Sequence, residues 1–99
     1  MFSALGQATR WRTFELLLEQ GDHGLLQGEI GRALGIDKNL MSVHLRIMRE
    51  AGLVESERSG REVTYRVTPA AMRHAAEALL KKIDGAAKLA AEKQPSAKA

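Results

Sequence analysis

The sequence predicts a mainly α-helical domain with one small β-hairpin, in the order α-α-α-α-β-β-α. Two patterns favour this fold class. Apolar residues recur at helical spacing over most of the chain, whereas apolar and polar residues alternate between Leu53 and Val67 around a glycine. At 99 residues the chain has room for one hydrophobic core. We therefore expect one domain over residues 1–92, followed by a flexible C-terminal tail over residues 93–99.

The N-terminal part of the chain predicts two helices. A short helix covers residues 2–5 and precedes Gly6. A longer helix covers residues 8–20 and ends at Gly21, because glycine often stops a helix. The apolar residues of the longer helix share one face, which we expect to lie in the core: Trp11, Phe14, Leu17 and Leu18.

Two further helices are predicted over residues 25–34 and 38–51, joined by the short turn Gly35-Ile36-Asp37. Gly35 suits the left-handed position after a helix, and Asp37 suits the N-cap of the next one. Each helix has an apolar side that we expect to face inward. These residues are Leu26, Ile30, Ala33 and Leu34 in the first helix, and Leu40, Met41, His44, Leu45, Ile47, Met48 and Ala51 in the second. We expect His44 to be a hydrogen-bonded core histidine.

Residues 53–67 predict two antiparallel strands with Ser59-Gly60-Arg61 at the tip of their turn. Thr68 as N-cap and Pro69 as first helical residue then begin a last helix, which reaches at least Ile83. Two helices joined by a short turn form a helix-turn-helix, and the hairpin that follows takes the place of a wing. The predicted architecture is therefore a winged helix-turn-helix.

The helix over residues 38–51 has the properties of a helix that enters the major groove of DNA. Its outward side chains are short or polar: Asn39 can bond adenine, Val43 can meet a thymine methyl group, and Arg46 can reach guanine or phosphate. An arginine at the wing tip can enter the minor groove or hold a phosphate. The predicted DNA contacts are Lys38, Asn39, Ser42, Val43, Arg46, Arg58 and Arg61.

A structural explanation competes with this one. The polar face of the helix could simply be solvated, and Arg46 and Arg49 could pair with Glu50 or other surface acids. The order of the elements, together with the basic wing tip, favours the contact with duplex DNA.

Composition excludes several classes of function. The chain is 44% hydrophobic and 27% charged, with a formal net charge of +3, which suits a polyanionic partner. It contains no cysteine, so thiolate metal sites and cysteine nucleophiles are excluded. Neither a nucleophile–base pair, nor a phosphate-binding glycine loop, nor converging carboxylates are recognisable, so we expect no enzymatic activity and no cofactor. With no membrane span and no signal peptide visible, we expect a cytoplasmic protein.

Three segments resemble the ArsR (arsenical-resistance repressor) family. Residues 4–12 (ALGQATRWR) are similar to its opening, with Gln7-Ala8 in place of the usual Asp-Pro before Thr9-Arg10. Residues 42–54 (SVHLRIMREAGLV) match its most characteristic segment, and Gly60-Arg61 with Tyr65-Arg66-Val67 resemble its wing. The MarR and other winged-helix families share the architecture but fit residues 42–54 less well. The resemblance covers roughly residues 4–83, and it implies a dimeric repressor that releases DNA when an effector binds.

The chain departs from the family at the sensor. Metalloid sensors of the family carry a Cys-x-Cys pair where this chain has Leu26 and Gly28. Zinc sensors use Asp and His pairs on the last helix, where this chain offers only His74 and Glu77. One imidazole and one carboxylate fall short of the four ligands of a structural zinc site, so we expect no metal site.

The last helix predicts a homodimer, because its apolar side is larger than a helix at the edge of a small domain can hide. We expect the interface at Met72, Ala76, Leu79, Leu80 and Ile83, with residues 1–5 beside it. Trp11 either fills the core or lines a pocket at this interface that senses an apolar molecule. The sequence thus favours a DNA-binding repressor that a non-thiol signal, such as an unidentified small molecule, releases. A constitutive regulator without effector and a winged-helix protein-interaction module without DNA binding stay as alternatives.

Overall fold

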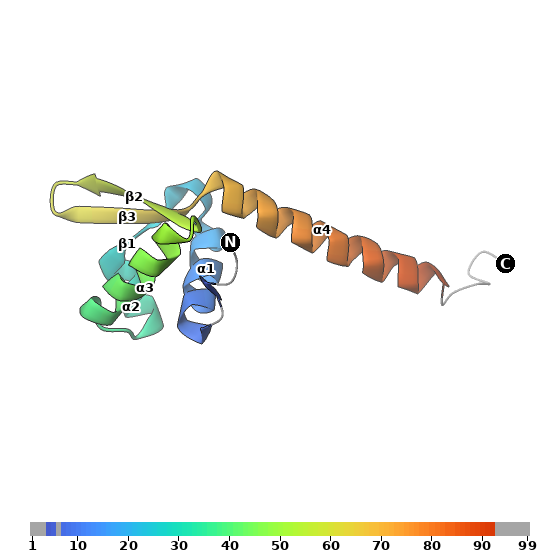
Figure 1. The fold of residues 1–99 in the computed structure, drawn as a ribbon, viewed down its shortest axis with the longest axis horizontal. Helices are drawn as coiled ribbons and strands as arrows, with labels where there is room; N and C mark the ends of the chain where they lie inside the picture. Colours follow the sequence, from blue (N-terminus) through green and yellow to red (C-terminus); the bar gives the residue numbers. More distant parts are fainter. Residues whose placement is uncertain (1–3, 6, 93–99) are drawn as a thin grey trace.

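The computed structural model describes residues 4–5 and 7–92, and Figure 1 shows their fold. The helices are α1 (Ala8–Gln20), the short 3-10 helix η2 (Gly21–His23), α2 (Gln27–Leu34), α3 (Lys38–Glu50) and α4 (Pro69–Glu92). The strands are β1 (Leu25–Leu26), β2 (Val54–Ser59) and β3 (Glu62–Val67). Of the short helix predicted over residues 2–5, only Ala4 and Leu5 are described, and they form a 3-10 turn. The tail predicted over residues 93–99 lies outside the described residues.

The sheet has three antiparallel strands in the order β1-β3-β2, where the sequence predicted two. Leu25 and Leu26 were expected to begin a helix, but they pair with Tyr65 and Thr64 of β3 instead. Leu26 is then the N-cap of α2. The prediction failed here because a strand of two residues has no periodicity of its own, and its conformation depends on a partner forty residues away.

The helix-turn-helix is held together by close backbone contacts. Gly35 adopts a left-handed conformation with φ 69° at the end of α2, as predicted. The amide of Ile36 donates to the carbonyl of Gly31 at 2.9 Å. A Cβ atom on Gly31 would lie 3.0 Å from the carbonyl oxygen of Ile36, so glycine allows the turn to return this closely to α2.

A single core lies where α1, α2 and α3 meet the sheet and the first turn of α4. The buried apolar side chains come from every one of these elements: Phe14, Leu17, Ile30, Met41, Leu45, Met48, Leu53, Val54, Tyr65, Val67 and Ala71. Three residues predicted to face inward do not. Ala33 is exposed, Leu40 is 46% exposed, and Trp11 is 47% exposed. Each lies at the edge of its helix's apolar arc, where spacing alone does not decide which side is covered.

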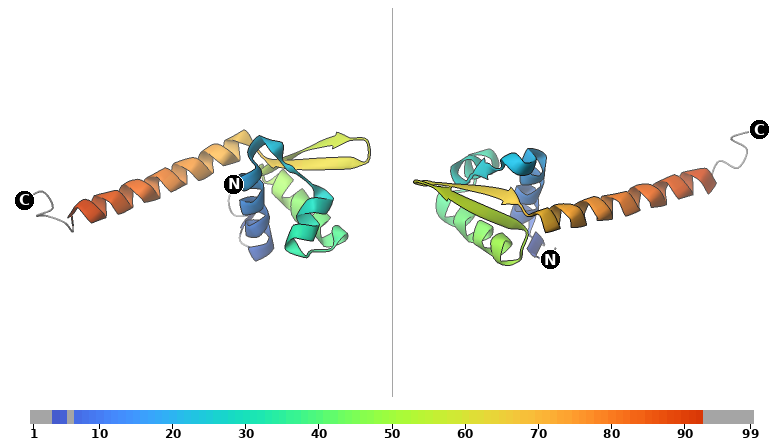
Figure 2. Two further views of the ribbon diagram at one scale, coloured as in Figure 1. Left: turned by 180° about the vertical axis from the view of Figure 1, so that it is seen from behind. Right: turned by 90° about the horizontal axis from the view of Figure 1, so that it is seen from above.

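Helix α4 begins in the body of the molecule and then leaves it (Figures 1 and 2). Its start is as predicted: Pro69 is the first helical residue, and the hydroxyl of Thr68 accepts from the amide of Ala71 at 3.1 Å. Beyond Ala75 its described side chains are exposed. This projecting helix gives the molecule extents of 64 × 22 × 21 Å.

Candidate nucleic-acid interface

Helix α3 has one buried and one open face. Met41, His44, Leu45 and Met48 are buried in the body. The five predicted contact residues of this helix are all exposed on the remaining surface: Lys38, Asn39, Ser42, Val43 and Arg46. The open face is therefore polar with one apolar side chain at its centre, since Val43 is 41% exposed. This is the composition that a helix needs to contact base edges in a major groove.

Both ends of α3 are fixed to the body. At its start, the carboxylate of Asp37 accepts from the amide of Leu40 at 3.1 Å, which is the predicted N-cap. At its end, Nη1 of Arg49 donates to Oγ of Ser56 in β2 at 3.3 Å. Arg49 thus contacts the wing. The sequence analysis had considered an ion pair between Arg49 and Glu50 instead. This hydrogen bond links the last turn of α3 to the wing.

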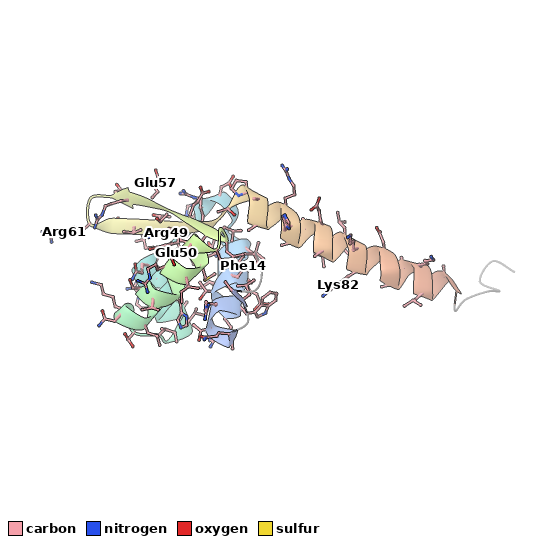
Figure 3. All side chains as sticks on the ribbon, in the orientation of Figure 1. Phe14, Arg49, Glu50, Glu57, Arg61 and Lys82 are labelled. Carbon is pink, nitrogen blue, oxygen red and sulfur yellow. The ribbon has the colours of Figure 1, made fainter. Side chains whose placement is uncertain are left out.

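The wing, formed by β2 and β3, projects from the body on the side where α3 lies (Figure 1). Gly60 has φ 62° and is followed by Arg61 with negative φ, the backbone pattern of a type II′ hairpin turn. Figure 3 shows Arg61 at the tip of the hairpin, pointing away from the body. Arg58 is also exposed near the tip. Further down, Arg66 pairs with Glu57 at 3.1 Å and donates to the carbonyl of Asp22 at 3.1 Å, so one of the wing's acids has a cationic partner.

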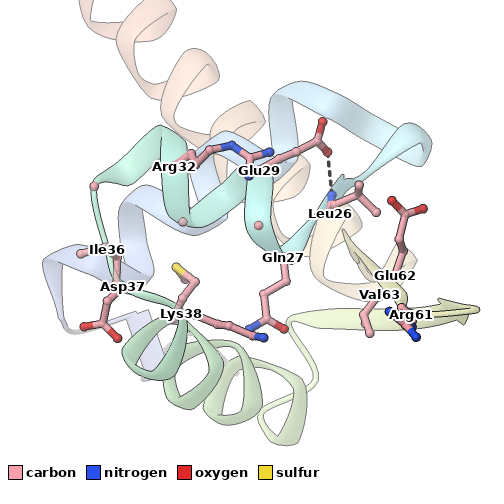
Figure 4. Close-up of a pocket in the computed structure, with 14 residues that line it drawn as sticks. Leu26, Gln27, Glu29, Arg32, Ile36, Asp37, Lys38, Arg61, Glu62 and Val63 are labelled. Carbon is pink, nitrogen blue, oxygen red and sulfur yellow. Dashed lines mark hydrogen bonds between the residues drawn. The ribbon is translucent and has the colours of Figure 1, made fainter.

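A groove of about 840 Å³ lies between the helix-turn-helix and the wing tip (Figure 4). Lys38 and Arg61 both line it, although they are far apart in the sequence. The groove also contains Gln27 and Arg32 of α2, which the sequence analysis did not identify. Figure 4 shows the side chains of Lys38 and Gln27 extending toward each other. Only the fold brings these residues together, and no local motif marks them.

Three acids line the groove: Glu29 and Asp37 accept backbone hydrogen bonds, and Glu62 is exposed next to Arg61. A carboxylate oxygen of Glu29 accepts from the amide of Leu26 at 2.8 Å, and Asp37 caps α3. The lining cations Arg32, Lys38 and Arg61 are exposed, as are the three acids, so the groove has no net charge of its own. The parts of this surface suited to a polyanion are therefore the open face of α3, with Lys38 and Arg46, and the wing tip, with Arg58 and Arg61.

His44 is buried behind this surface, with 7% of its area exposed, as predicted. The predicted hydrogen bond is absent at one nitrogen, because Nδ1 is buried and has no partner among the described residues. Nε of Arg10 is in the same situation. Burial of the imidazole, and the nearby positive charge of Arg10, lower the pKa of His44 below its ordinary value of 6.5. At neutral pH the histidine is therefore uncharged.

The predicted dimerisation residues lie along α4. Met72 is half-buried, whereas Ala76, Leu79, Leu80 and Ile83 are exposed. Within residues 4–5 and 7–92, no group of three or more His, Asp or Glu side chains is placed to hold a metal ion. No helix in the described part of the chain is long and apolar enough to cross a membrane.

Comparison with known proteins gives matches to DNA-binding regulators. The MarR family model matches residues 7–62. The HTH-type transcriptional repressor SmtB of Mycobacterium tuberculosis is 46% identical over 46 residues, which cover 46% of this chain and 34% of that protein. The chain thus spans about a third of the length of this curated relative.

Solved structures share the fold over most of the chain. The ArsR-like transcriptional regulator from Rhodococcus sp. RHA1 is 31% identical with a TM-score of 0.61, over 94% of this chain and 86% of that one. The homodimeric winged helix-turn-helix domain of a possible ArsR-family regulator from Mycobacterium bovis has a TM-score of 0.69 at 24% identity. That match covers 83% of this chain and 74% of the other. These matches confirm the predicted winged helix-turn-helix fold.

Proposed function

This chain belongs to the MarR and ArsR group of winged helix-turn-helix transcriptional regulators, and on that basis we propose that it binds specific duplex DNA as a homodimer and represses transcription in the cytoplasm. One observation carries the proposal. Lys38 at the start of α3 and Arg61 at the wing tip line one groove, and the other predicted contact residues of α3 are exposed on the open face of the same helix.

The side chains of this surface divide by chemistry. Asn39, Ser42 and Val43 have the size and polarity to contact base edges, so we assign sequence discrimination to them. Lys38, Arg46, Arg58 and Arg61 are exposed cations that reach phosphates or the neighbouring minor groove. The chain contains no cysteine, so a signal that releases DNA acts on it without a thiolate.

Helix α4 supplies the dimer interface in this proposal. Met72, Ala76, Leu79 and Ile83 follow one another at alternating intervals of four and three residues, the spacing of a helix-pairing seam. Leu79, Leu80 and Ile83 are 59%, 57% and 51% exposed in one copy, which leaves a large apolar surface open to water. A second copy of α4 covers such a seam.

The apolar residues of the seam suit an antiparallel pair of α4 helices. If two α4 helices cross at Lys81, Leu79 of one lies opposite Ile83 of the other, so the largest seam residues meet at the centre. Pro69 precedes Lys81 by twelve residues, or about 18 Å of helix, which separates the two starts of α4 by about 36 Å.

Titration with salt tests the proposal. A protein that contacts about 6 to 10 phosphates loses about 10³ to 10⁵ in affinity between about 50 and 200 mM salt. We expect the full chain to show such a decrease on duplex DNA selected from a random pool. We expect Arg61→Ala to weaken binding to all duplexes and to reduce the salt slope by about one. Asn39→Ala should relax discrimination at one base position.

Arg12→Ala provides the matched control, because Arg12 is an exposed arginine of α1 outside the predicted contact surface. It should leave affinity and salt slope close to the parent values. Failure of the parent to bind any duplex at low salt would contradict the proposal and favour a protein-interaction module. Equal behaviour of all three variants would show that the contact surface is wrongly assigned.

A further inference from the structure

We infer that Leu40 is a further DNA contact, and that Leu40 and Val43 form an apolar pair on α3 that covers the methyl groups of two thymines in each half-site. The inference rests on the DNA binding proposed above and deepens it, because it names the base that this part of α3 selects. Leu40 was expected in the core and was not among the contacts predicted from the sequence.

Leu40 and Val43 are the large apolar side chains that α3 leaves in water. They are 46% and 41% exposed, and the other large exposed apolar side chains in residues 4–5 and 7–92 belong to α1 and α4. One exposed leucine is common on a protein surface and needs no explanation. Two adjoining apolar side chains on the helix proposed to read DNA call for an apolar partner in the groove.

The helix period makes the two side chains neighbours. Leu40 lies three residues before Val43, about 60° away around α3, and the Cβ atoms of such pairs are about 5 to 6 Å apart. In the opposite direction around the helix from Val43 lie Ser42 and Arg49, and Arg49 donates to Ser56 of the wing. Leu40 therefore lies beside the centre of the open face, on its flank away from the wing.

Leu40 also lies at the end of α3 that enters a groove. It is the third residue of the helix, and its amide donates to the carboxylate of Asp37 at 3.1 Å. The N-terminal residues of a reading helix are the ones that contact base edges. Exposed cations precede and follow the pair along α3, at Lys38 and Arg46. With these two cations on phosphates, the apolar pair between them faces the bases.

Thymine is the base whose chemistry matches this pair. Its methyl group is the apolar group on the floor of the major groove, whereas the other bases present hydrogen-bonding atoms there. An aliphatic side chain over those atoms would bury them without a partner. Successive base pairs are about 3.4 Å apart, so two side chains about 5 to 6 Å apart reach methyl groups one or two base-pair steps apart.

Replacement of thymine by deoxyuridine tests the inference, because it removes the methyl group and keeps the base-pair hydrogen bonds. The full chain selects a duplex from a random pool, and each thymine of one half-site is then replaced in turn. We expect two sensitive positions, one or two steps apart. At each of them the replacement should weaken binding about fourfold, the loss expected for one buried methyl group.

Two substitutions assign the methyl groups to side chains. Leu40→Ala should abolish the preference for thymine over deoxyuridine at one sensitive position and keep it at the other, and Val43→Ala should do the reverse. Leu89→Ala is the matched control, because it removes a leucine that is 56% exposed at the far end of α4. It should keep both preferences. The readout is a ratio of two affinities of the same variant, so a general change in stability cancels.

The outcomes separate this inference from the proposed function. If the parent binds its selected duplex equally well after every replacement, or selects half-sites without two such thymines, the apolar contact is overturned and DNA binding is retained. If Leu40→Ala keeps the preference at both positions, the assignment of Leu40 is overturned. Absence of binding to any duplex would overturn the proposed function and the inference with it.

Discussion

At the scale of single residues, His44 carries the clearest chemical consequence. Its imidazole is buried behind the open face of α3, and the positive charge of Arg10 lies near enough to lower its pKa. Helical spacing predicted its burial, but spacing says nothing about hydrogen-bond partners. The unpaired Nδ1 arises from the way α1 and α3 pack, which is a tertiary property.

The lowered pKa of His44 predicts that the folded protein loses stability in acid. Because the pKa in the folded state lies below the ordinary 6.5, the unfolded chain binds more protons as the pH falls through that value. The contribution of His44 to the free energy of unfolding is complete above pH 6.5 and is lost progressively below that pH. Urea denaturation from about pH 7.5 to about pH 5.5 should show a smaller decrease in unfolding free energy for His44→Gln than for the parent.

His23→Gln is the matched control, since His23 is exposed in η2. It should retain the pH dependence of the parent. A pH dependence in His44→Gln equal to that of the parent would show that another group titrates.

At the scale of elements, caps and turns were the most predictable features. Gly35, Asp37, Thr68 and Pro69 all occupy the positions that their chemistry predicts. Their roles depend on neighbours within a few residues, so the sequence contains the information. β1 and the groove between α2 and the wing were not predictable. Both arise from pairing and packing between distant segments, as the pairing of Leu25 with Tyr65 illustrates.

Removing the N-cap of α3 should lower the free energy of unfolding by a measurable amount. Asp37→Ala removes the acceptor for the amide of Leu40 and should lower the unfolding free energy by about 1 kcal/mol. Asp37→Ser restores an oxygen acceptor and should recover most of that loss. Denaturation in urea measures both variants. Equal stability of Asp37→Ala and the parent would mean that the cap contributes nothing to holding α3.

At the scale of the whole molecule, the projecting helix is the dominant feature. The sequence predicted an apolar side on α4 and an interface there, and it placed Trp11 either in the core or at that interface. It did not predict that α4 leaves the body, because helical periodicity describes a face and not a direction in space. The exposure of Leu79, Leu80 and Ile83 becomes interpretable only once that direction is known.

The central claim is that the open face of α3 enters the major groove twice, in a symmetric pair. Hydroxyl-radical footprinting of the full chain on a duplex selected by the protein tests it most directly. Leu79→Asp, which should be monomeric by ultracentrifugation, is the comparison and should lose the paired pattern. For the parent, the account predicts two protected segments on one side of the duplex, related by two-fold symmetry and centred about 10 base pairs apart. A single protected segment, or two at a spacing that places them on opposite sides of the duplex, would contradict it.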